Sequence, residues 1–116
     1  MSDETLLTIH QFNDAFNRHD VDAIMALMTD DCVFENTSPF PDGTPYEGAV
    51  AVRGFWETFF AGSPNAHFVT EDEFACNDRA VVRWTYHWSD TDHIRGVDVF
   101  RVRDGKVAEK LAYVKG

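Results

Sequence analysis

Apolar side chains in the first third of the chain recur at the spacing of a helix. Four of them lie three or four positions apart: Leu6, Ile9, Phe12 and Phe16. This stripe predicts one helix with a single buried face. Asp20 predicts the N-cap of a second helix, because its carboxylate can accept hydrogen bonds from the first-turn N–H groups. The apolar side chains of that second helix are Val21, Ile24, Met25 and Met28.

The middle of the chain predicts a short strand, a loop and a third helix. The strand is expected at residues 32–35, after a break at residues 29–31. Residues 37–48 contain three prolines and two glycines, which predicts a loop. The third helix is expected at residues 49–61, with four apolar side chains on one face: Val52, Phe55, Trp56 and Phe59.

The second half of the chain predicts four strands. Residues 67–76 and 79–88 flank Asn77 and Asp78, a turn pair that tolerates unusual backbone angles. Two further strands are expected at residues 93–103 and 107–114, on either side of Asp104 and Gly105. Helices followed by an antiparallel meander indicate an α+β fold, with the helices covering one face of a bent sheet.

Composition narrows the class of protein. The chain has 116 residues, and we interpret residues 1–116 as one domain. Its formal net charge is -10, which disfavours nucleic acids and anionic membranes as partners. No apolar run approaches the roughly 20 residues of a membrane span. The acidic residues at the start of the chain do not resemble a targeting signal, and Cys32 and Cys76 form no metal or redox spacing. We therefore expect a cytoplasmic protein with both cysteines reduced in the core.

Three segments resemble the SnoaL-like branch of the NTF2-like superfamily. They are residues 16–23 (FNRHDVDA), 30–35 (DDCVFE) and 95–106 (RGVDVFRVRDGK). The superfamily includes ketosteroid isomerases, polyketide cyclases, scytalone dehydratase and limonene-epoxide hydrolase. The resemblance implies a cone-shaped fold, in which three N-terminal helices pack in a strongly curved, mostly antiparallel sheet around a deep apolar pocket. It also implies a homodimer through the outer face of the sheet.

Strand alternation places one carboxyl inside the predicted cone. The apolar set of residues 82–88 should face the helices: Val82, Trp84, Tyr86 and Trp88. In the next strand the same alternation turns Asp98 inward. A carboxylate in apolar surroundings is costly unless it is protonated, hydrogen-bonded or paired, and its raised pKa suits proton transfer. The other interpretation is an Asp98 that faces outward or is held by one satisfied ion pair. The resemblance also implies that Asp98 occupies a catalytic position of the family.

The register of the last hairpin leaves two partners for Asp98. A three-residue loop at residues 103–105 would pair Val102 with Lys106 and place Lys110 across from Asp98. A tighter Asp104–Gly105 turn would place Leu111 there instead. The resemblance favours Lys110, which would hold Asp98 ionised. Lys110 could equally sit at the pocket mouth with its head in water.

Departures from the family patterns argue against steroid isomerisation. Where the resemblance implies the isomerases' general-base Asp, this chain has Asn36, and it has Phe12 where they have a Tyr donor. Gly96 stands where the epoxide hydrolases have an Arg, and the turn at residues 89–92 lacks the His of the cyclases. A metal set around His87 and His93 is a weaker interpretation than a solvated turn.

The resulting prediction is a protein that binds an apolar or aromatic small molecule with a carbonyl or hydroxyl group. Asp98 would be the catalytic acid or base, and nine residues would form the pocket: Phe12, Phe34, Asn36, Trp56, Trp84, Tyr86, Trp88, Phe100 and Lys110. An enzyme of this kind would be an isomerase, cyclase, lyase or hydrolase that uses no cofactor and no metal. The alternative is a non-catalytic ligand-binding or dimeric scaffold domain.

Overall fold

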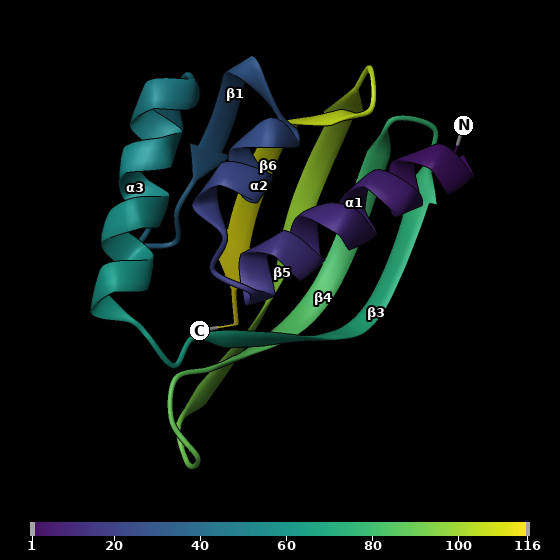
Figure 1. Ribbon diagram of the computed structural model, residues 1–116. Coiled ribbons are helices and arrows are strands. Elements are labelled where there is room, and N and C mark those ends of the chain that lie inside the picture. Colours follow the sequence, from purple (N-terminus) through teal and green to yellow (C-terminus); the bar gives the residue numbers. More distant parts are fainter. Residues whose placement is uncertain (1, 116) are drawn as a thin grey trace.

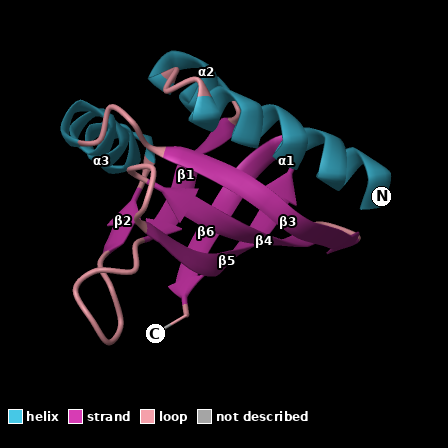
Figure 2. Cartoon of the chain, turned by 90° about the horizontal axis from the view of Figure 1, so that it is seen from below, coloured by secondary structure: helices cyan, strands magenta, loops and turns pink. Residues whose placement is uncertain are grey.

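A computed structural model describes residues 2–115; Met1, the start of the acidic N-terminal stretch, and Gly116 lie outside the described residues. Along the chain the elements are α1 (Ser2–Asn17), α2 (Val21–Ala26), β1 (Met28–Glu35), β2 (Pro45–Glu47), α3 (Ala49–Gly62), β3 (His67–Cys76), β4 (Arg79–His87), β5 (His93–Arg103) and β6 (Lys106–Val114). The helices lie on the concave side of a curved sheet, with α1 mainly over β3 and β4, α2 near β1, and α3 beside β1 and β2 (Figures 1 and 2).

The sheet is mixed, open and six-stranded, in the order β2-β1-β6-β5-β4-β3. Only β1 and β6 pair in parallel; every other neighbouring pair is antiparallel. The α+β cone with a mostly antiparallel sheet is therefore confirmed. Since no helix among the described residues is both long and apolar enough, none could cross a membrane.

The helices follow the predicted stripes, with one correction. Ile9, Phe12 and Phe16 are buried on α1, and the Asp20 carboxylate accepts from the Ala23 N–H at 3.1 Å, as an N-cap does. The second helix ends at Ala26, so Met28 belongs to β1 and not to the helix as predicted. The reason is a partner far along the chain: the Val107 N–H donates to the Leu27 carbonyl at 2.7 Å and draws this segment beside β6.

Three other local predictions were wrong. Residues 29–31, expected as a break, lie within β1 (Met28–Glu35). The predicted loop at residues 37–48 contains the edge strand β2, whose Tyr46 pairs with Phe34 of β1. Pro45 has no backbone N–H to donate, which is tolerated because it is the first residue of an edge strand. Cys32 is buried as expected, but Cys76 is exposed, because it ends β3 on the face of the sheet away from the helices.

The hairpin between β5 and β6 differs from both predicted registers. Asp104 and Gly105 have positive φ values of 54° and 76° and form a two-residue turn, so Arg103 pairs with Lys106 and Val102 with Val107. A bulge at Ala108 then shifts the register by one residue. As a result, Asp98 lies opposite Ala112, and Lys110 lies opposite Phe100. The bulge returns the Lys110 side chain to the face that carries Asp98, which the tight turn alone would not do.

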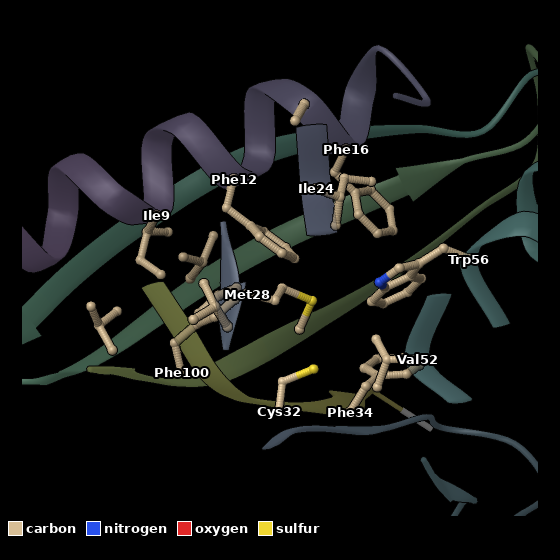
Figure 3. Close-up of a cluster of buried hydrophobic side chains, with 14 of the residues drawn as sticks. Ile9, Phe12, Phe16, Ile24, Met28, Cys32, Phe34, Val52, Trp56 and Phe100 are labelled. Carbon is tan, nitrogen blue, oxygen red and sulfur yellow. The ribbon is translucent and has the colours of Figure 1, made fainter. Parts of the chain in front are cut away.

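The core fills the concave side of the sheet. Figure 3 shows Phe12 of α1 above Phe100 of β5, and Trp56 of α3 between Phe16 and Phe34. The Phe12 and Phe100 rings meet edge to face, with centroids 5.8 Å apart. Gly96 is needed beside this core, because a Cβ there would lie 2.3 Å from the Tyr113 carbonyl oxygen and 2.7 Å from the Trp84 ring. Trp84 can therefore lie flat over β5 and close one side of the interior.

Candidate functional site

A buried acid–base pair lies on the inner face of the sheet. Asp98 comes from β5 and Lys110 from β6, and each residue is only 5% exposed. Lys110 Nζ lies 3.6 Å from Asp98 Oδ2. The structure thus places Asp98 inward, in contact with Lys110, and buries the Lys110 head instead of letting it reach water. The two side chains meet diagonally, two positions apart on neighbouring strands, and not directly across the ladder.

Burial brings the pKa values of the two groups towards each other. It raises the pKa of Asp98, and this effect outweighs the opposing influence of the Lys110 ammonium and the Trp84 indole N–H. Burial also lowers the pKa of Lys110, although the negative charge of Asp98 acts to raise it. The Trp84 N–H is close enough to affect the carboxyl, but its geometry falls short of a hydrogen bond. Because the two pKa values approach each other, a proton passes between this acid and this base more readily than between the same groups in water.

Three aromatic rings surround the Lys110 ammonium. Nζ lies 4.8 Å from the ring centroid of Phe16, 5.0 Å from that of Phe34 and 5.2 Å from that of Trp56. These rings come from α1, β1 and α3, so three elements meet at this one nitrogen. Aromatic faces attract a cation but give it no hydrogen-bond acceptor oxygen.

An apolar cavity of about 100 Å³ adjoins the pair. Seven of the predicted site residues line it: Phe34, Asn36, Trp56, Trp84, Tyr86, Asp98 and Lys110. A second space of about 20 Å³ lies against Asp98 and Lys110 as well, next to Asn13, Asn17 and Thr70. It has room for about one water molecule. The pair therefore borders both an apolar chamber and a small polar one.

Three residues predicted for the pocket do not line this cavity. Phe12 and Phe100 are fully buried and pack against each other in the core. Trp88 lies one residue beyond the end of β4 and is 40% exposed. Its ring contacts Tyr86 at a centroid distance of 5.5 Å, so it lies behind a wall residue. An inward-facing side chain can thus pack in the core or reach solvent without bordering the cavity.

The prediction also missed several wall residues. Phe55 and Phe59 of α3 line the cavity, although their helical stripe predicted only a buried face. Phe68 of β3 lines it too and stacks on Tyr86, with centroids 4.6 Å apart. Alternation along residues 67–76 would have turned Phe68 inward, so a signal for it existed. Ala112, directly opposite Asp98, carried no signal because its position depends on the bulge.

Three residues that line the cavity each carry a buried polar atom without a protein partner. Among residues 2–115, Asp98 Oδ1, Trp56 Nε1 and Trp84 Nε1 are buried without a hydrogen bond. Buried polar groups are nearly always hydrogen-bonded, so three such atoms among the residues of one cavity are unusual. They supply one acceptor, or a donor when the carboxyl is protonated, together with two N–H donors. A carbonyl or hydroxyl inside the cavity could satisfy them. No group of three or more metal-binding side chains gathers within the part of the chain that the structure describes.

Comparison with known proteins agrees with this architecture. The profile of the SnoaL-like domain family matches residues 9–110. The chain is 40% identical to an NTF2-like protein of unknown function from Mesorhizobium loti; the match covers 99% of this chain and 93% of that one, with a TM-score of 0.88. No curated protein matches the chain.

More distant structures share the fold. A putative ketosteroid isomerase from Kribbella flavida is 17% identical, with a TM-score of 0.85 over 99% of this chain and 80% of that one. A putative polyketide cyclase from Sinorhizobium meliloti is 22% identical, with a TM-score of 0.75 over 91% of this chain and 93% of that one. At these identities the likeness concerns the fold alone. Because the family profile covers most of its length, the chain belongs to the SnoaL-like family of NTF2-like proteins.

Proposed function

We propose that this protein binds a small apolar or aromatic molecule in its cavity and moves a proton to or from it through Asp98. The molecule carries a carbonyl or hydroxyl group that Trp56 and Trp84 can hydrogen-bond. The reaction would be an isomerisation, cyclisation, dehydration or hydrolysis by general acid–base chemistry, with no metal or redox cofactor. The distant neighbours described as an isomerase and a cyclase share only the fold, so they do not select among these reactions.

The observation that carries the proposal is the environment of Asp98. Its carboxyl is buried, borders the cavity, has one oxygen without a partner and has a pKa raised by burial. A general acid or base works best when its pKa lies near the operating pH. Purely structural carboxylates gain more from complete hydrogen bonding, which Asp98 lacks.

The cavity volume limits the size of the ligand. A cavity of about 150 Å³ in another protein holds benzene, and common ligand pockets are roughly 300–1,000 Å³. The 100 Å³ here is smaller than the benzene cavity, so a short chain fits, a single ring needs small shifts of the wall side chains, and a steroid would need large ones. We therefore choose 3-cyclohexenone as the first probe, because its isomerisation to the conjugated ketone needs only proton transfer and changes its ultraviolet absorbance.

Filling the cavity should weaken binding of this probe. Ala112→Leu places a branched side chain directly opposite Asp98, so we expect the Kd to rise about tenfold or more, which corresponds to about 1.4 kcal/mol. Binding is measured as quenching of Trp56 and Trp84 fluorescence in a Trp88→Phe background. Ala51→Leu, the same change on the exposed face of α3, is the matched control. Equal Kd values for both variants would place the ligand elsewhere.

Binding without conversion would favour the alternative function, a non-catalytic ligand-binding domain. Asn36 and Phe12, which stand where the resemblance implies a general base and a donor, are the residues that favour it. Conversion of any single-ring carbonyl compound at a rate that depends on the cavity would exclude it.

A homodimer through the outer face of the sheet is also part of the proposal. Directly paired apolar residues cross four strands on that face: Phe74, Val81, Val99 and Leu111. Phe74 is 60% exposed in the single chain. We expect a solution mass of twice the 13.2 kDa chain by light scattering, and a shift to the single-chain mass in Val99→Glu. A monomeric wild-type protein would remove the dimer from the proposal.

A further inference from the structure

Lys110 differs from the other lysines of the chain. The sequence contains three lysines, and Lys106 and Lys115 are exposed at the two ends of β6. Lys110 is buried, borders the apolar cavity and lies among Phe16, Phe34 and Trp56. A long, strongly hydrated side chain that usually keeps its head in water has here been placed beside a ligand-sized space.

The surroundings of Lys110 Nζ suit an uncharged amine better than an ammonium. An ammonium has three N–H donors. Among the described residues, Asp98 supplies the one carboxylate within 4.0 Å of Nζ, at 3.6 Å. Transfer of one proton from Lys110 to Asp98 leaves two neutral groups and removes the cost of burying two charges. The amine then has a lone pair beside the Asp98 O–H at the edge of the cavity, and the lowering of the Lys110 pKa by burial also favours the uncharged amine.

We propose that Lys110 Nζ forms a covalent imine with an aldehyde or ketone bound in the cavity. This inference rests on the proposed function, because it needs the cavity to admit a small carbonyl compound. It adds the substrate class and a second catalytic residue, since Lys110 itself becomes bonded to the substrate. Desolvation in an apolar pocket is one of the ways in which proteins activate a lysine for this chemistry.

The neighbouring groups can complete the reaction without a co-reactant. The amine attacks the carbonyl carbon while the Asp98 carboxylic acid gives its proton to the carbonyl oxygen, which forms a carbinolamine. The nitrogen returns one proton to Asp98, and Asp98 then protonates the hydroxyl, which leaves as water as the C=N bond forms. The product is a protonated imine beside the Asp98 carboxylate. The Trp84 N–H, which lies beside the Asp98 carboxyl and has no hydrogen-bond partner, can donate to the departing oxygen.

Reductive trapping tests this proposal on the unmodified protein. We would incubate the native protein with benzaldehyde, or with the slimmer butanal, and cyanoborohydride at pH 7, and then map modified lysines by mass spectrometry. A lowered pKa raises the neutral fraction of a lysine at pH 7, so we expect Lys110 to be modified several-fold more than the exposed Lys106 or Lys115. The two exposed lysines serve as controls within the same molecule. Modification spread equally over the three lysines, or confined to the exposed two, would overturn the proposal.

Two variants and a binding measurement separate this proposal from the function on which it rests. Lys110→Met should lose the modification at position 110 and keep the background at the other two lysines, with circular dichroism as the check on folding. Asp98→Asn should slow trapping at Lys110, because no acid then assists. Tryptophan quenching by benzaldehyde without trapping would refute the imine and leave the ligand cavity intact. Neither quenching nor trapping by either aldehyde would refute both.

Discussion

Asp98→Asn should reduce turnover by about 100- to 10,000-fold, the range that general acid–base groups contribute. The amide has nearly the shape of the carboxyl and can still form hydrogen bonds, but it cannot exchange a proton at physiological pH. The measurement is kcat/KM for the single-ring carbonyl compound that the wild-type protein converts best. Ligand binding, followed by tryptophan quenching, should change far less, because the cavity wall keeps its shape.

The control is the same substitution at a carboxylate that has no contact with the cavity. Asp72 is exposed on the outer face of β3, so Asp72→Asn should retain wild-type kcat/KM. Full activity in Asp98→Asn would remove Asp98 from the chemistry, however well its position fits. A proportional loss of binding and turnover would instead make it a binding residue.

Local sequence patterns predicted the elements that depend on residues close to one another in the sequence. The stripe on α1, the Asp20 cap and the alternation of β4 and β5 all depend on neighbouring residues, and the structure follows them. The end of α2 and the existence of β2 depend on partners far along the chain. The Val107 N–H donates a hydrogen bond to the Leu27 carbonyl, and Phe34 pairs with Tyr46 across two strands. No helical or strand period in those segments contains that information.

The site was predictable to the extent that it follows from alternation. Because side chains alternate strictly along a strand, the inward direction of Asp98 followed from Gly96 and Phe100 on either side of it. The position of Lys110 depended on the bulge at Ala108, which leaves no signal in residue type. Alternation also does not separate a cavity from a core, so Phe100 and Phe34 received the same prediction although only Phe34 borders the cavity.

Removing one member of the buried pair should destabilise the protein more than removing both. We expect Lys110→Met to lower the free energy of unfolding by about 3–5 kcal/mol, because Asp98 is left buried without its partner and must either stay charged or take a proton from solvent. The double variant Lys110→Met with Asp98→Leu should recover most of that loss, since apolar side chains suit these surroundings. The measurement is urea unfolding of four proteins: the wild type, both single variants and the double variant. Their free energies of unfolding give the interaction energy between Lys110 and Asp98.

The pH dependence of Lys110→Met provides an independent check on this explanation. Without the lysine, burial alone raises the pKa of Asp98, so the folded protein holds a proton that the unfolded chain releases. Stability from that proton is complete at acidic pH and is lost as pH rises through the folded-state pKa. The single variant should therefore lose stability as pH rises above the ordinary pKa of an aspartate, and the double variant should not show this loss. If both variants lost stability in parallel, the lost stability would come from packing around the Lys110 stem and not from the charge on Asp98.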